Sequence, residues 1–292
     1  MPKSRHDVRV GVPHLLSAEG FDLAWSQHMT LMLARLNQLV AGTDYEDRDL
    51  KGIVLDSARS PSQAAVFNHA SMAHNTDFFF KQLRPSSDGT PAEIPAPLRS
   101  AIDDNFGSAE TLRREFAATA SAMFGPGFIW LVKASHLPQS GRGGDNLRLL
   151  TTYLAGSPYP GAHWRRQAVD MNTVGADGVD SSSSSGNVAR QWLDKQAAAV
   201  SAGGVSSATA FTASSSSTHL PAASSTDRRP PGGIDAIPLL CLSTWEHVWL
   251  RDYGLGADGY GGKAAFVDAW WNAIDWDAVA EMANLNRPML KT

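Results

Sequence analysis

Two short segments of the sequence concentrate side chains that could do chemistry. Ser243-Thr-Trp-Glu-His247 brings a hydroxyl, a carboxylate and an imidazole into one short run, and Glu246 and His247 could form a local buried pair. Gly161-Ala-His-Trp-Arg-Arg-Gln167 is a basic and aromatic patch suited to contact with phosphate or protein, or else a solvated loop. Its candidate contact residues are His163, Trp164, Arg165 and Arg166. The single cysteine, Cys241, lies in an apolar run and is expected to be a small core residue.

The composition limits the class of protein. The chain has 292 residues, 43% of them hydrophobic, which is enough for a sizeable core. Its formal net charge is -4, whereas a protein that covers itself in nucleic acid usually carries a large positive excess, so any RNA contact should be local. One cysteine excludes an internal disulfide. No apolar run approaches about 18 residues, so no membrane span is expected.

The N-terminus gives no clear targeting signal. Met1–Arg9 is basic but lacks the apolar core of a signal peptide, so secretion is not expected. The segment is also too short and irregular to be an intact transit peptide.

Hydrophobic periodicity predicts helices at both ends of the chain. The first should run from the N-cap candidate Ser17 through Val40, and a second from about Ser62 to Leu83 between two prolines. A third should begin at the N-cap candidate Ser108 and end near Gly125. The tail predicts two further helices, over residues 263–272 and 276–282.

Between these helical parts the pattern changes to strands. Residues 128–134 and 147–154 read as an antiparallel pair, and 238–242 as a third strand. A Ser/Ala/Gly-rich insertion at about residues 160–233 lacks enough apolar surface to offset its ordering entropy, so we expect it to be largely disordered, with one possible helix at 188–197.

These elements predict an α+β fold. We expect an N-terminal helical hairpin domain over residues 1–85. A C-terminal α/β domain over residues 86–292 should follow, interrupted by the insertion.

The order of short motifs resembles the iron/manganese superoxide dismutase family. Pro238–Tyr253 resembles the family signature D-x-W-E-H-A-Y-Y-x-D-Y, and Phe124–Val132 resembles F-G-S-G-W-A-W-L-V. Shorter matches lie at Leu16–Glu19, Leu36–Val40, Val66–Asn68, Phe78–Phe80, Asn105–Ser108 and Ala155–Pro158. Their shared order and spacing cover nearly all the chain outside the insertion. The resemblance implies the family fold, a helical hairpin followed by a small three-stranded antiparallel sheet with surrounding helices.

The resemblance also locates the metal-ligand positions of the family, which are three histidines and one aspartate. They fall on Ala24, Thr76, Ser243 and His247, and only His247 matches. One imidazole with these replacements offers neither the ligand number nor the charge to hold iron or manganese. His74 should not substitute, because two residues turn a helix by about 200°. The resemblance therefore implies no metal, no cofactor and no catalytic residue.

The residues that surround those positions in the family are replaced here by apolar ones. The gateway tyrosine of the family aligns with Met32, and the tryptophan beside the metal aligns with Phe128. The solvent-binding glutamine aligns with Met72 in iron-type enzymes and with Ala155 in manganese-type enzymes. Apolar filling avoids unsatisfied buried polar groups, which cost about 1–3 kcal/mol each. The alternative, ordinary core substitutions in a working enzyme, does not fit the ligand losses.

The resemblance implies a dimer interface formed by His28, Glu246, His247 and Leu250. In the family, the glutamate at position 246 reaches the metal-ligand histidine of the partner subunit. His28 aligns with a histidine that meets a tyrosine of the partner, and that tyrosine position is Leu250. Because leucine cannot return the hydrogen bond, we expect a heterodimer with a second dismutase-like chain in preference to a homodimer.

Metal-free relatives of this family are structural proteins of the mitochondrial small ribosomal subunit, where a pair of dismutase-like chains occurs, and this sequence is similar to them. The resemblance implies a non-catalytic ribosomal protein of the mitochondrial matrix. Its partners would be other small-subunit proteins, with limited rRNA contact. Two alternatives remain open: a divergent superoxide dismutase with a rearranged metal site, and a free-standing scaffold that dimerises without binding a ribosome.

Overall fold

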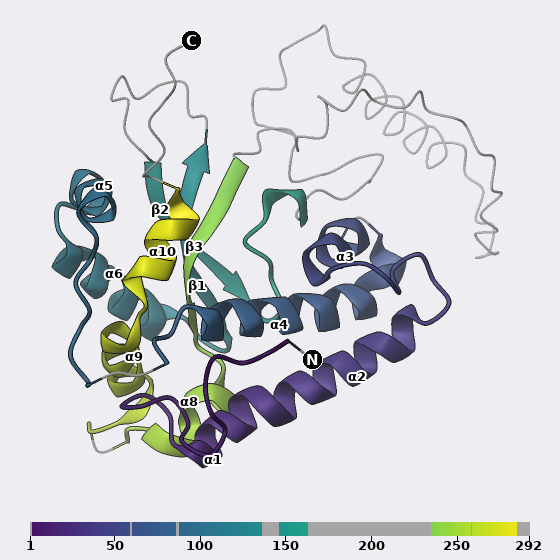
Figure 1. Ribbon diagram of the computed structural model, residues 1–292, viewed down its shortest axis with the longest axis horizontal. Helices are drawn as coiled ribbons and strands as arrows, with labels where there is room; N and C mark the ends of the chain where they lie inside the picture. The colour runs from purple at the N-terminus through teal and green to yellow at the C-terminus, as the bar shows by residue number, and fades with distance from the viewer. Residues whose placement is uncertain are drawn as a thin grey trace, which may run out of the picture. The chain divides into compact units, whose positions relative to one another are not determined.

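The computed structural model describes residues 2–58, 60–85, 88–135, 146–162, 235–257 and 259–284. In this part of the chain, helices surround a three-stranded antiparallel sheet (Figure 1), so the predicted α+β class is confirmed. The described residues belong to one compact unit, Met1–Trp164 with Gly232–Thr292, and the division at residue 85 stays a prediction. The insertion beyond residue 162 and the helix expected at 188–197 lie outside the described residues.

The first helical segment begins at the predicted cap. Ser17 precedes α1 (Ala18–Phe21), and its hydroxyl accepts a hydrogen bond from the Gly20 N–H at 3.0 Å. The single helix expected through Val40 is interrupted, because a π-helical stretch, η1 (Asp22–Gln27), separates α1 from α2 (His28–Val40). Such stretches are rare and often lie at functional sites.

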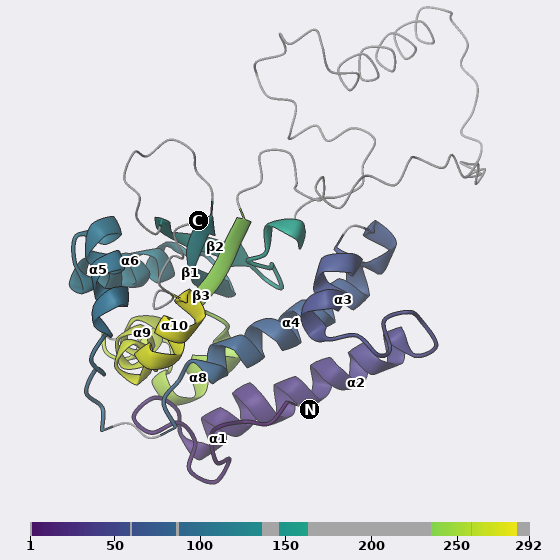
Figure 2. The same cartoon turned by 45° about the horizontal axis from the view of Figure 1, so that its top comes forward.

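The hairpin pairs α2 with α4 (Ala64–Lys81), which follows a 3-10 turn, η2 (Pro61–Gln63). The two helices run side by side in both views (Figure 2). A helix that the sequence analysis did not predict, α3 (Leu50–Ser57), packs on α4. Together they enclose a small second core of Leu36, Val40, Ile53, Val54, Val66, Ala70 and Ala162.

Two helices lie between the hairpin and the sheet in the sequence. The first, α5 (Ala96–Phe106), was not predicted, whereas α6 (Ala109–Ala122) begins at the predicted cap, where the Ser108 hydroxyl accepts from the Thr111 N–H at 3.0 Å. The chain then leaves the helix through Gly125, whose φ of +102° favours glycine.

The sheet has the order β2-β1-β3, with β1 (Gly127–Ser135) between β2 (Asn146–Tyr153) and β3 (Asp235–Ser243). All three predicted strands are confirmed; β1 and β3 are longer than predicted, and β2 is shifted by one residue. Pro238 is accommodated because β3 is an edge strand and the register shifts at its partner Val132.

The buried amide of Gln82, just after α4, covers the outer edge of β3. Its Oε1 accepts from the Cys241 N–H at 2.8 Å, and its Nε2 donates to the Leu239 carbonyl. The Gln82 side chain therefore forms hydrogen bonds with two backbone groups of β3 that have no partner strand.

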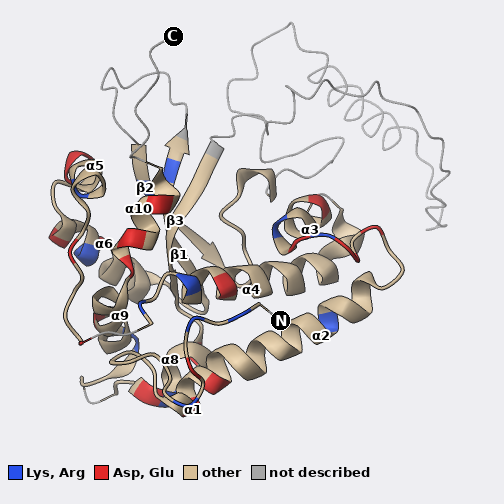
Figure 3. Ribbon diagram, in the orientation of Figure 1, with Lys and Arg blue, Asp and Glu red and all other residues tan. Residues whose placement is uncertain are grey.

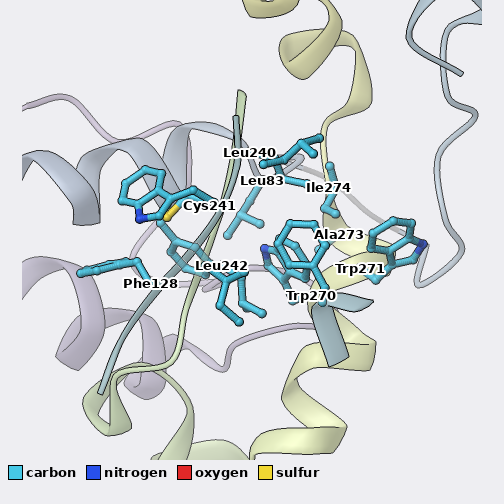
Figure 4. Packing of buried hydrophobic residues seen from close by; sticks show 14 of the residues in the cluster. Leu83, Phe128, Leu240, Cys241, Leu242, Trp270, Trp271, Ala273 and Ile274 are labelled. Carbon is cyan, nitrogen blue, oxygen red and sulfur yellow. The ribbon is translucent and has the colours of Figure 1, made fainter. Parts of the chain in front are cut away.

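The C-terminal part supplies α8 (Glu246–Tyr253), α9 (Gly262–Ala273) and α10 (Trp276–Ala283); the last two were predicted. A short turn, η3 (Pro160–Ala162), follows β2. Figure 4 shows Leu240 and Leu242 of β3 on the side of Ile274 and Trp270, with Cys241 toward the opposite side. The predicted core role of Cys241 is confirmed, because it is fully buried. None of the described helices has the length and apolar character needed to cross a bilayer.

Candidate functional site

The four positions expected to correspond to metal ligands come from four different elements. Ala24 lies in η1, Thr76 in α4, Ser243 at the end of β3 and His247 in the first turn of α8. Two pairs of these elements are in contact: η1 contacts α8, and α4 contacts β3. The first three residues are buried and His247 is half-buried.

The side chains at these positions do not fit iron or manganese. Ala24 has no donor atom, and the Ser243 hydroxyl accepts from the Trp245 N–H at 3.4 Å. Within the described ranges, no group of three or more His, Cys, Asp or Glu side chains is placed to hold a metal ion. Two hydroxyls and one imidazole supply no carboxylate to balance a divalent or trivalent charge.

His247 instead stacks on His28 from α2. The two ring centroids lie 4.1 Å apart with 24° between the planes, and the Trp245 ring lies 5.6 Å from His247. Burial, and then the nearby His28, lowers the pKa of His247 to about 3, and burial also lowers the pKa of His28. Both rings are therefore neutral at physiological pH. This contact could not be predicted from the sequence, because it joins residues far apart in the chain.

Two buried polar atoms at this stack have no hydrogen-bond partner within the described part of the chain. They are His28 Nδ1 and the indole Nε1 of Trp245. Glu246, beside them on α8, is half-buried and forms no hydrogen bond or ion pair with described residues, so the local Glu246–His247 pair is absent there. Leu250 is exposed one turn further along α8. The interface role of these residues stays a prediction.

The apolar replacements line the same core. Met72, Phe128 and Ala155 are buried in the main hydrophobic cluster with Ala24, and Met32 packs against it. Phe128 of β1 lies directly opposite Ser243 of β3 in the sheet register. The side chains around the expected ligand positions are therefore mainly apolar.

His74 has a structural partner of its own. Its Nε2 lies 3.2 Å from the Tyr159 hydroxyl, and its ring packs on Phe78. Burial raises the pKa of Tyr159 to about 12, and the Lys51 ammonium lies 4.7 Å from the Tyr159 ring centroid. This arrangement ties α4 to α3 and to the segment after β2.

The second candidate patch, His163, Trp164, Arg165 and Arg166, lies outside the described residues. Its contact role stays a prediction.

Comparison with known proteins assigns the class. The sequence model of the iron/manganese superoxide dismutases, C-terminal domain, matches residues 95–158 and 184–282, more than half of the chain. The chain belongs to this family.

Particular relatives differ in how much of the chain they match. Small ribosomal subunit protein mS43 of Schizosaccharomyces pombe is 27% identical over 272 residues, which cover 91% of this chain and 78% of that protein. An iron superoxide dismutase of Campylobacter jejuni is 35% identical over 121 residues, 40% of this chain and 53% of that enzyme. One from Legionella pneumophila is 28% identical over 158 residues, 54% of this chain and 73% of that enzyme. The chain thus spans about half of the Campylobacter enzyme.

Proposed function

We propose that this chain is a non-catalytic structural protein of the mitochondrial small ribosomal subunit. The observation that carries the proposal is the extent of the match to small ribosomal subunit protein mS43, which reaches 91% of this chain. Shared fold alone does not define function, so the proposal also needs the chemistry of the site.

The donor set at the former ligand positions supports a non-catalytic role. Ala24, Thr76 and Ser243 cannot replace two histidines and an aspartate, and His247 is stacked on His28. The family's chemistry depends on a bound metal, and these side chains do not supply its ligands.

The charge distribution supports contacts with proteins more than with rRNA. Figure 3 shows Lys and Arg interspersed with Asp and Glu on the described helices. Many of the cations already have partners within the chain: Arg5, Lys81, Arg113 and Arg251 pair with carboxylates. Others donate to carbonyl oxygens near helix ends, namely Arg84, Lys133 and Lys263. Cations held in this way contribute less to phosphate binding.

The proposal includes a dimer with a second dismutase-like chain. His28, Glu246, His247 and Leu250 form the proposed contact. Glu246 is half-buried and Leu250 is exposed on α8, which leaves both side chains accessible to a partner and supports the contact.

A divergent superoxide dismutase is the second candidate, and the identity of 35% to the Campylobacter jejuni enzyme favours it. Elemental analysis of the purified chain, with a dismutase assay on the same sample, separates the two. We expect iron and manganese far below one atom per chain and no activity. Stoichiometric metal with activity would contradict the non-catalytic proposal.

Co-sedimentation tests ribosome association. The tagged chain is expected to migrate with the small subunit in a gradient of mitochondrial lysate and to remain there at moderate salt. Migration only as a free dimer would favour the scaffold alternative.

A further inference from the structure

Residues 2–10 form an N-terminal strap that two neighbouring side chains hold to the rest of the chain. The strap contains no helix or strand and begins beside the point marked N in Figure 1. The structure describes all of these residues, and among them only His6 is buried, with 7% of its surface exposed. Arg5 is exposed but forms two hydrogen bonds with other elements.

Both side chains bind the last turn of α4. The Arg5 Nη1 donates to the Lys81 carbonyl at 2.8 Å, and the His6 Nε2 lies 3.2 Å from the Phe80 carbonyl oxygen. The last carbonyl groups of a helix lack partners within the helix, so the strap supplies donors to them. The Arg5 Nη2 also donates at 2.9 Å to Asp275, the N-cap of α10. The strap therefore joins the end of α4 to the start of α10.

The strap ends at a defined hinge. Gly11 follows it with a φ of +82°, and a Cβ at this position would lie 2.4 Å from the Leu16 carbonyl oxygen, so glycine is required there. Beyond the hinge the chain is fixed, because Val12 and Leu16 are buried and exchange two backbone hydrogen bonds of 2.9 and 2.8 Å. Release of the strap would therefore leave the residues after Gly11 in place.

The surroundings of His6 disfavour its protonation. A carbonyl oxygen can only accept, so the neutral imidazole carries its proton on Nε2, toward Phe80. The Nδ1 atom is buried and has no hydrogen-bond partner among the described residues. The ring lies against the Phe21 and Phe80 rings, with centroids 5.7 and 6.5 Å away. A second proton would place a charge among apolar rings, which is costly.

The charged groups around His6 do not offset this cost. Those on the strap and on α1, α4 and α10 form the ion pairs Arg5–Asp275, Lys81–Asp77 and Arg251–Glu19. Within the strap, Asp7 accepts from the Arg9 N–H at 2.9 Å, and Lys3 is exposed. Burial lowers the pKa of His6; the bond to the Phe80 carbonyl opposes this shift, and the adjacent Arg5 adds to it.

We propose that the N-terminal strap is a proton-sensitive latch, in which uptake of a proton by His6 releases residues 2–10 from α4 and α10 with Gly11 as the hinge. The closed strap holds the pKa of His6 below its usual 6.5, so closure is fully favourable above about pH 6.5 and weakens as the pH falls. The equilibrium constant for closure should fall by up to about tenfold per pH unit in that range. The inference does not depend on the proposed function.

Exchange-saturation NMR of the backbone amides measures the population of the open strap in the full chain. At Val8 and Val10 this population should rise by up to about tenfold per pH unit as the pH falls from 6.5 to 5. Val12 and Leu16 should show no matching exchange. An open population that does not rise would overturn the inference. So would equal exchange at Val12 and Leu16, because opening would then not be confined to the strap.

Two neutral replacements of His6 separate proton uptake from loss of the contact. His6→Gln keeps a donor for the Phe80 carbonyl, His6→Leu keeps an apolar side chain, and neither takes up a proton. In both variants the open population should be independent of pH from 6.5 to 5, whatever its level at pH 7. The control His14→Asn removes an exposed histidine and should keep the wild-type pH response. A pH response that persists in either His6 variant, or disappears in the control, would overturn the latch.

Discussion

His247, which the family resemblance places at a metal-ligand position, stacks on His28 with the ring centroids 4.1 Å apart. The position survives in the signature Trp245-Glu-His247, while its expected co-ligands are Ala24, Thr76 and Ser243. The four expected ligand positions rest on residue identities at a known spacing, so the sequence alone is enough to make that prediction. The stack could not be predicted, because ring geometry depends on how η1, α2 and α8 pack.

The stack makes a pH prediction. Because the folded pKa of His247 is lowered to about 3 and that of His28 is also lowered, the unfolded chain takes up protons first as the pH falls below about 6.5. The free energy of unfolding should therefore decrease from pH 7 toward pH 4. His247→Gln should make that decrease shallower by up to about 1.4 kcal/mol per pH unit.

Urea unfolding at several pH values measures this slope. His14→Asn is a suitable control, because His14 is exposed and asparagine tolerates its φ of +60°. An identical slope in wild type and His247→Gln would contradict the assigned burial of the stack.

At the scale of elements, helices with a side-chain cap or a clear hydrophobic periodicity could be predicted from the sequence. Short helices, or helices that bury few side chains, could not. The caps at Ser17 and Ser108 are confirmed. Three helices were missed. Both α3 (Leu50–Ser57) and α8 (Glu246–Tyr253) have only eight residues and no side-chain cap, and α5 (Ala96–Phe106) buries few side chains. Their positions are set by tertiary packing, since short isolated helices are marginal in water.

The contact of α8 with α1 makes an element-scale prediction. Asp252 accepts from the Ser17 N–H at 2.9 Å and from the Ser17 hydroxyl at 2.6 Å, and that hydroxyl caps α1. Asp252→Asn keeps only one acceptor and should lower the free energy of unfolding by about 1 kcal/mol. Glu19→Gln, which breaks an exposed ion pair with Arg251, should cost less than about 0.5 kcal/mol. Equal costs in chemical denaturation would refute the distinction.

The edge of β3 makes a second prediction at the scale of elements. Gln82→Met removes both bonds of the buried amide and leaves the Cys241 N–H and the Leu239 carbonyl unpaired, so it should cost about 2 kcal/mol or more. Hydrogen exchange at the Cys241 amide should accelerate in parallel. Gln38→Met, on the exposed face of α2, serves as the control and should change neither quantity. Protection of the Cys241 amide from hydrogen exchange equal to that of the wild type would show that Gln82 does not form these hydrogen bonds with β3.

At the scale of the whole molecule, family membership follows from the matched residues 95–158 and 184–282, whereas the assembly is a proposal. Motif order predicted the family and the sheet, because short motifs at fixed separations record the fold. Which apolar side chains are exposed could not be predicted in this way, since exposure is known only once the chain is folded.

The proposed dimer makes a prediction at this scale. Glu246→Ala should weaken the complex with the second dismutase-like chain, because the family resemblance assigns this carboxylate a contact with the partner subunit. Gel filtration of the two co-expressed chains over a range of dilutions measures the shift. Elution of the variant complex identical to that of the wild type would argue against Glu246 as an interface residue.

The most direct test of the central claim is the stoichiometry of this chain in purified small subunits. Mitochondrial small subunits are washed in high salt, separated on a gradient and measured by quantitative mass spectrometry against established subunit proteins. The account predicts that the chain is present in amounts equal to those proteins, in fractions whose iron and manganese do not rise with it. A chain that is absent from the washed subunits, and that carries metal and dismutase activity in the soluble fraction, would contradict the account.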